Sequence, residues 1–252
     1  MQLMENVVDF NKLSVEKKQV LFEELETFDR QIFPNAIPAE LHQLLYNPDV
    51  VALPIIRFYH RGKIVGQNII AILKLKTAHQ PLCILSSRAA FLPDYRNQNR
   101  TLLSAIRLTL GYRLKYPTRQ LWFVSSLMQP KVYRLFASRS KRFYPRAEVS
   151  MPEDHLQVLD LMQNRHVNVQ QRSDDVFVHP CVLPQTTPEQ LIRLRNRASR
   201  HINFYMQHTP DYFVGMGLMC ICKLDLLTLL EAAINVFLGE KLPKQKLSPY
   251  FI

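Results

Sequence analysis

An apolar run, an amphipathic helix and a second apolar run follow one another between residues 82 and 126, and this order constrains the fold most strongly. Leu82–Ala90 is apolar and ends shortly before Pro93. Arg100–Lys115 has apolar residues at three- and four-residue spacing, which predicts a helix. Gln120–Ser126 is the second apolar run. Strand, helix and strand joined in this way form a right-handed unit with parallel strands, so we expect a partly parallel sheet.

Two helices and a hairpin are predicted before this unit. Ser14–Ile32 has a capping residue and helical spacing, and Pro38–Tyr46 begins with a proline suited to a first turn. Ile55–Tyr59 and Lys63–Leu75 flank a tight turn that contains Gly62, which indicates an antiparallel hairpin. The sheet is therefore predicted to be mixed, and the fold class is α/β (or α+β), with helices flanking a central sheet.

Weaker patterns follow residue 126. A linker-like run at Pro184–Pro188 separates them from a strongly apolar stretch, Tyr212–Leu238. We expect a sheet-containing domain over 1–184 and a mainly helical, apolar extension over 185–252 that packs on it. The other predicted elements are helices over Pro130–Ser138, Glu153–Met162 and Glu189–Met206, and a strand over Val176–Val182.

Basic side chains are concentrated in the middle of the chain. Residues 50–147 contain 18 lysines and arginines and one acid, Asp94, whereas the whole chain has a net charge of +11. Such a block attracts a polyanion: a phosphorylated cofactor, nucleic acid or anionic lipid. A solvated basic surface is the alternative interpretation.

Several classes of protein are disfavoured by composition. Four cysteines in 252 residues do not make a disulfide framework. The N-terminus lacks the charged and apolar regions of a signal peptide, and no uncharged apolar run reaches 18 residues. P-loop, Gly-x-Ser-x-Gly and His-Glu-x-x-His motifs are missing from the sequence. We expect a cytoplasmic protein, with export without a cleaved signal as the alternative.

The segment PDYRNQNRTLL, from Pro93 to Leu103, resembles the cofactor motif of the GNAT superfamily of acyl-CoA-dependent N-acyltransferases. That motif is Gln or Arg, two residues, Gly, one residue, and Gly or Ala, at a strand-to-helix turn. Arg96 matches its first position, and Asn99 and Thr101 stand where the glycines belong. The order of predicted elements over residues 14–183 is also similar to that family.

The resemblance implies an acyltransferase that moves an acyl group from acetyl-CoA, a longer acyl-CoA or an acyl-carrier thioester to an amine. No metal is implied. A helix N-terminus binds a pyrophosphate through free backbone N–H groups, and arginine and lysine add charged hydrogen bonds. The residues expected to bind the cofactor are Arg88, Arg96, Asn97, Asn99, Arg100, Thr101 and Lys131.

Two catalytic roles are considered. Residues 126–133 resemble the family segment whose tyrosine protonates the departing thiolate, so Tyr133 is the candidate general acid, and a packing tyrosine is the alternative. The expected glutamate base on the central strands is missing, since residues 50–147 hold only Asp94. Glu26, Asp29 and His60 are possible substitutes. Without a base, the fold would bind an acyl ligand without rapid turnover.

Three further patterns have less specific interpretations. His179, Cys181, Cys220 and Cys222 could form a zinc site, but their one-residue spacings favour buried cysteines. A basic stripe at helical spacing favours a solvated face, with a phosphate or lipid contact as the alternative; its members are Arg193, Arg197, Arg200 and His201. Tyr212–Leu238 is interpreted as two helices or a hairpin packed on the sheet, with an acyl-chain channel or an anionic-membrane surface as alternatives.

Acyl transfer is therefore the predicted function. The first alternative is a non-catalytic acyl-ligand or membrane-associated module on the same fold. The second is a nucleic-acid binder, which is disfavoured because the basic block coincides with the predicted cofactor turn and lacks a recognisable nucleic-acid motif.

Overall fold

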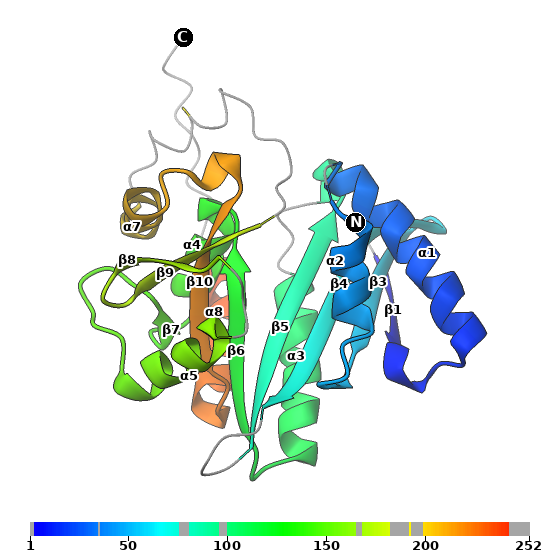
Figure 1. The fold of residues 1–252 in the computed structure, drawn as a ribbon, viewed down its shortest axis with the longest axis horizontal. Coiled ribbons are helices and arrows are strands. Elements are labelled where there is room, and N and C mark those ends of the chain that lie inside the picture. Colours follow the sequence, from blue (N-terminus) through cyan, green and yellow to red (C-terminus); the bar gives the residue numbers. More distant parts are fainter. Residues whose placement is uncertain are drawn as a thin grey trace.

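The computed structural model describes residues 3–34, 36–75, 81–95, 100–164, 168–181, 192 and 199–241 of the 252-residue chain. A single mixed sheet of ten strands runs through these residues in the order β1-β3-β4-β5-β6-β10-β9-β8, with β2 paired to β4 and β7 paired to β10 (Figure 1). The fold class predicted from the sequence is confirmed.

The strands of the sheet are β1 Met4–Asp9, β2 Val50–Ala52, β3 Pro54–His60, β4 Lys63–Leu75, β5 Leu82–Phe91, β6 Gln120–Leu127, β7 Phe143–Tyr144, β8 Gln170–Ser173, β9 Val176–Pro180 and β10 Met216–Lys223. The helices are α1 Val15–Ile32, α2 Pro38–Leu45, α3 Arg100–Lys115, α4 Pro130–Ala137, α5 Glu153–Gln163, α7 Arg200–His208 and α8 Leu226–Lys241. Short 3-10 turns are η1 Phe10–Lys12, η2 Pro93–Tyr95 and η3 Tyr212–Val214.

The N-terminal half agrees closely with the sequence patterns. Ser14 caps α1 by accepting a hydrogen bond from the backbone N–H of Lys17. The hairpin between β3 and β4 turns at Arg61 and Gly62, both of which have positive φ, as a tight two-residue turn requires. β5 and β6 are parallel, and every other strand pair in the described sheet is antiparallel.

Helices cover both faces of the sheet (Figure 1). On one face, α1 and α2 bury Leu25 and Leu41 against the apolar side chains of β3 and β4, and α5 buries Leu159 against β6 and β10. On the opposite face, α3, α4 and α7 pack on the largest core cluster, which includes Tyr133 and Tyr205. These layers position the ends of β5 and β6 between two sets of helices.

The interpretation of the apolar stretch Tyr212–Leu238 as two helices or a hairpin packed on the sheet is wrong over Met216–Lys223. These residues form β10, which lies inside the sheet between β6 and β9. All six inner residues of β10 are buried, so both of its faces are apolar. A short apolar run of this kind has no period that separates a buried strand from a buried helix.

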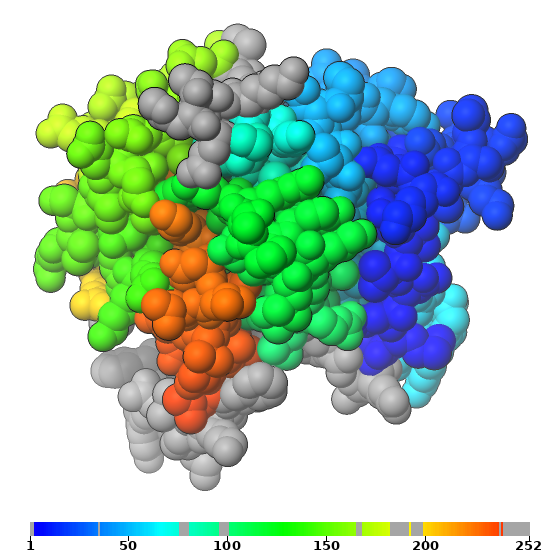
Figure 2. Space-filling view, turned by 90° about the horizontal axis from the view of Figure 1, so that it is seen from below, coloured from blue at the N-terminus to red at the C-terminus, as the bar shows by residue number. Residues whose placement is uncertain are grey.

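α8 confirms the helical part of that interpretation, although only one of its faces is covered. Thr228, Leu229 and Val236 are buried, and the helix packs against α3. Figure 2 shows α8, in orange, on the molecular surface beside green residues. The opposite face is apolar and exposed; it comprises Leu226, Leu227, Leu230, Ile234 and Leu238. Among the described residues, no helix is long and apolar enough to cross a membrane.

The basic helix predicted over Glu189–Met206 is observed from Arg200 onward as α7. Arg193 and Arg197 lie outside the described residues, as does the domain boundary expected after residue 184.

Candidate functional site

The two parallel strands β5 and β6 diverge at their C-terminal ends. Their pairing extends from Leu82↔Gln120 to Leu85↔Phe123, while β5 continues to Phe91 and β6 to Leu127. The outer edge of β5 remains paired with β4 along its whole length, and the outer edge of β6 remains paired with β10. The facing edges of the two strands therefore stop pairing after Leu85 and Phe123, and Figure 1 shows the strands spreading apart.

Helix α3 begins close to these diverging ends. η2 follows β5 almost directly, and α3 then starts at Arg100, with no acidic residue in its first turn. The first N–H groups of a helix have no intrahelical partner and attract anions. Thr101 is half-buried in this first turn. Arg96, Asn97 and Asn99 lie outside the described residues, and so does the side chain of Arg100.

Arg88 does not point to a free phosphate position. Its guanidinium donates two hydrogen bonds to Asp29 of α1, with Nε–Oδ1 at 3.3 Å and Nη2–Oδ2 at 2.5 Å. It also lies over the ring of Phe33, at 5.2 Å from the centroid. The Asp29 side chain is only 3% exposed. The structure therefore pairs a predicted cofactor residue with a predicted base.

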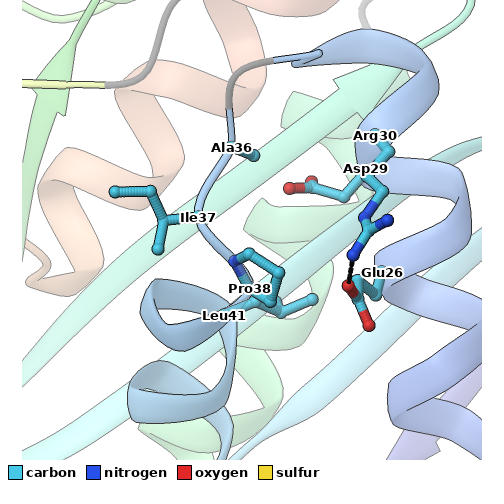
Figure 3. Close-up of a pocket in the computed structure, with 7 residues that line it drawn as sticks. All are labelled: Glu26, Asp29, Arg30, Ala36, Ile37, Pro38 and Leu41. Atoms are coloured by element: carbon cyan, nitrogen blue, oxygen red, sulfur yellow. Dashed lines mark hydrogen bonds and ion pairs between the residues drawn. The ribbon is translucent and has the colours of Figure 1, made fainter.

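A shallow hollow with a cavity volume of only about 10 Å³ lies beside this ion pair, between the end of α1 and the start of α2. Figure 3 shows Glu26, Asp29 and Arg30 of α1 opposite Pro38 and the other lining residues, with Glu26 paired to Arg30. The Glu26 side chain is 20% exposed, so it is the more accessible of the two carboxylates in the hollow.

His60, the third candidate base, lies at the end of β3. Its Nδ1 is 2.8 Å from the hydroxyl oxygen of Tyr95 in η2, so the two side chains are hydrogen-bonded. This contact ties the β3–β4 hairpin to the turn that precedes α3. His60 is thus close to the predicted cofactor turn, whereas Glu26 lines the hollow between α1 and α2.

Tyr133 is fully buried in α4. Its hydroxyl donates to the carbonyl oxygen of Pro145 at 2.8 Å, and its ring stacks on Phe204 at 5.9 Å. Burial raises the pKa of the phenol well above its usual value. In this conformation the hydroxyl faces the backbone, as in the packing alternative. Lys131, in the first turn of the same helix, is exposed.

Two groups of polar side chains near the diverging strands have no signal in the sequence spacing. Ser87 of β5 donates to Oδ1 of Asn68 at 2.7 Å, and Asn68 is fully buried. The Nδ2 atom of Asn68 has no hydrogen-bond partner among the described residues. On the other face, Ser126 of β6 hydrogen-bonds Cys181, whose pKa is raised to about 11 by burial.

The zinc alternative finds no support in the arrangement of its residues. Cys220 and Cys222 are buried thiols within β10, while Cys181 lies 3.8 Å from Nδ1 of His179. Across the part of the chain that the structure describes, no three His, Cys, Asp or Glu side chains are grouped to hold a metal ion.

No family model matches the chain, and no curated protein matches it. Several solved structures are similar. Escherichia coli ElaA is 13% identical, with a TM-score of 0.37, and the match covers 60% of this chain and 94% of ElaA. An acyl-CoA N-acyltransferase from Pseudomonas aeruginosa is 10% identical, with a TM-score of 0.36 and coverage of 61% and 94%.

A predicted acetyltransferase from Clostridium acetobutylicum, solved with acetyl-CoA, is 16% identical, with a TM-score of 0.37 and coverage of 66% and 100%. Identities of 10–16% and TM-scores below 0.5 leave the activity to be inferred from the chain's own residues.

Proposed function

We propose that this protein is an acyltransferase that transfers an acyl group from acyl-CoA, or from an acyl-carrier thioester, to an amine. The observation that supports the proposal is the divergence of β5 and β6 after Leu85 and Phe123, next to the acid-free N-terminus of α3. Diverging parallel strands expose backbone N–H and C=O groups that an extended, amide-containing ligand can pair with.

The residues near this point fit such a donor. Coenzyme A has a pyrophosphate, which suits the first turn of α3, and a pantetheine arm with two amides, which suits the facing strand edges. Asn68 adds a buried amide nitrogen beside the diverging part of β5, and this nitrogen has no hydrogen-bond partner among the described residues. Arg96, Arg100 and Lys131 would add charge around the phosphates, and Asn99 and Thr101 replace glycine at the turn. When bound, acyl-CoA supplies an activated acyl group as a thioester.

The amine acceptor would have to lose a proton during transfer. Both oxygens of Asp29 accept hydrogen bonds from Arg88, so this carboxylate serves to orient α1 against β5. Glu26 lines the same hollow, is more exposed, and is held by a single exposed arginine. We therefore assign the role of general base to Glu26, and the role of proton donor to the thiolate stays with Tyr133 as a proposal.

Calorimetric titration with acetyl-CoA and CoA tests the donor site. We expect saturable binding, which Arg96→Ala weakens by about 1–3 kcal/mol because a charged hydrogen bond is lost. Lys74→Ala is the matched control, because Lys74 is an exposed base of the same basic block at the opposite end of β4 from the hairpin turn that contacts Tyr95. Failure of the wild-type protein to bind either ligand would overturn the proposal.

One observation favours the alternative of a non-catalytic acyl-ligand module. The hydroxyl of Tyr133 is buried and already donates to Pro145. Acetyl transfer to a set of primary amines distinguishes the two functions. The acyltransferase is supported if the wild-type protein turns over and Glu26→Gln lowers the rate by about 10²–10⁴-fold while CoA binding is unchanged. Tight CoA binding without any transfer supports the module.

A further inference from the structure

Three arginines and a histidine converge where α4 meets α7, on the face of the sheet that also carries α3. The contacts of Tyr133 bring them together. Its ring lies 6.3 Å from that of His201, and its hydroxyl is bonded to Pro145. Arg134, Arg200 and Arg146 are the direct sequence neighbours of Tyr133, His201 and Pro145 respectively, and the positive charges of all three arginines act on His201.

These arginines lack carboxylate partners among the described residues, a property that they share with Arg61, Arg113, Arg119 and Arg139. Arg57, Arg107 and Arg172 each pair with an acidic side chain. Among the described residues, no acidic group lies within ion-pair distance of Arg134, Arg146 or Arg200. Uncompensated cations held close together repel one another, and a bound anion relieves that repulsion.

The three arginines are also arranged in depth. Arg146 is 8% exposed, and its Nη1 donates a hydrogen bond to the carbonyl oxygen of Ser140 at 2.9 Å, which restrains the guanidinium. Arg134 and Arg200 are exposed and can be reached from solvent. The cluster therefore contains one buried guanidinium held by a hydrogen bond and two exposed ones.

The N-terminus of α7 adds backbone donors to the same place. Ser199 precedes the helix in an extended conformation, and in the described part of the chain its side chain makes no capping hydrogen bond to the first N–H groups of α7. His201, in this first turn, has a buried Nδ1 without a hydrogen-bond partner in the described structure. A helix start that Ser199 does not cap and a buried imidazole nitrogen both supply polar groups for a ligand at this position.

The electrostatic environment of His201 agrees with this geometry. Burial lowers the pKa of His201, and the positive charges of Arg200, Arg146 and Arg134 lower it further. The imidazole therefore interacts electrostatically with all three arginines.

We propose that Arg134, Arg146, Arg200 and His201, with the start of α7, bind the phosphate group of a phosphorylated ligand. This site is formed by α4, α7 and Arg146, whereas the proposed pyrophosphate position is at the start of α3, and the test of this site does not depend on acyl transfer. A tetrahedral phosphate offers enough acceptor oxygens for the guanidinium groups and for the backbone N–H groups together. The solvated-face interpretation of the basic stripe predicts no such saturable site.

Calorimetric titration of the full chain with inorganic phosphate, at constant ionic strength in chloride, tests the proposal. We expect saturable binding that Arg134→Gln/Arg200→Gln weakens at least about tenfold, because two charged hydrogen bonds are lost. The control is Lys63→Gln/Lys74→Gln, which removes the same charge from exposed positions on β4 and should leave binding unchanged. Both variants change exposed side chains, and their thermal unfolding is checked first.

Two further ligands identify the source of the phosphate. Glycerol 3-phosphate represents a soluble phosphomonoester, and phosphatidylcholine vesicles that contain phosphatidic acid represent a lipid headgroup. Binding of either that depends on Arg134 and Arg200 supports the site and assigns its source. The proposal is overturned if no phosphate compound saturates the wild-type protein, or if both double variants weaken binding equally, which would show general charge attraction.

Discussion

Asp29 of α1 and Arg88 of β5 form an ion pair in which both carboxylate oxygens accept a hydrogen bond from the same guanidinium. The pair joins the helix that lines the hollow to the strand that diverges from β6. The carboxylate is almost completely buried, whereas the guanidinium is partly exposed. Removal of the arginine and removal of the aspartate should therefore lower the free energy of unfolding by different amounts.

Asp29→Ala should destabilise the protein by about 2–4 kcal/mol, because it leaves the Arg88 guanidinium unpaired beside apolar side chains. Glu26→Ala, on the same helix, is the control: Glu26 pairs with Arg30, which is 60% exposed, so its loss should cost at most about 0.5 kcal/mol. Urea denaturation measures both. Equal losses for the two variants would contradict a structural role for the buried pair.

Tyr133→Phe separates two roles of one hydroxyl. The variant removes the bond to Pro145 and leaves a buried carbonyl without its partner, so we expect a loss of stability of about 1–3 kcal/mol. If the phenol also protonates the thiolate, acyl transfer should fall by about 10²–10⁴-fold at a temperature where the variant is fully folded. Lower stability with unchanged turnover would limit Tyr133 to packing.

Gly217 of β10 should tolerate no side chain. A Cβ atom there would lie 2.8 Å from Sγ of Cys181 and 3.3 Å from Cβ of Ser126. Gly217→Ala should therefore destabilise by about 1–3 kcal/mol, and Cys181→Ala in the same chain should restore part of that loss.

Gly111→Ala provides the opposite control, because a Cβ at this α3 position would meet no atom within 4 Å. Replacing a helical glycine with alanine should stabilise by about 0.5–1 kcal/mol. Thermal unfolding of all four proteins measures these effects, and destabilisation by Gly111→Ala similar to that by Gly217→Ala would contradict the packing argument.

His155 should make the protein sensitive to acid. Its ring packs edge-on to Trp122 at 4.8 Å, and burial lowers its pKa below the usual 6.5. The folded state thus binds fewer protons than the unfolded state as the pH falls below about 6.5, so stability decreases until the folded-state pKa has been passed. The contribution of the neutral His155 imidazole to stability is complete at pH values above about 6.5.

His155→Phe should retain the ring and reduce this decrease. Urea denaturation followed by fluorescence of Trp122, the protein's single tryptophan, at about pH 7.5 and about pH 5 measures it. Part of the decrease should remain, since the pKa values of His201 and His208 are also lowered by burial. An identical decrease in wild type and variant would show that His155 does not contribute.

Much of the fold could be predicted because local patterns and tertiary contacts agree. α3 spans the predicted residues 100–115, and the β3–β4 hairpin turns at Gly62, as its sequence predicts. β10 could not be predicted as a strand, because its apolar run is buried on both faces and has no period. β8 was missed for the opposite reason, since all four of its residues are exposed and polar or charged.

The candidate site was less predictable, because it depends on pairings between distant segments. Arg88 has no sequence signal that distinguishes a phosphate-binding arginine from one bonded to a buried acid 59 residues away. The hydrogen bond between Ser126 and Cys181 likewise depends on tertiary structure, because both side chains meet beside Gly217 of β10. Conversely, the parallel pairing of β5 and β6 follows from the predicted strand–helix–strand unit, although the end of their pairing after Leu85 and Phe123 does not.

The central position of β10 has a consequence for how this protein is made. β6 and β9 lie on either side of a strand that is synthesised after both, so a nascent chain that has emerged only to residue 181 has no strand between them. Two open edges then persist in the incomplete sheet, and open edges pair readily with other chains. Ribosome-bound intermediates should accordingly need a chaperone until Met216–Lys223 has emerged and the sheet can close.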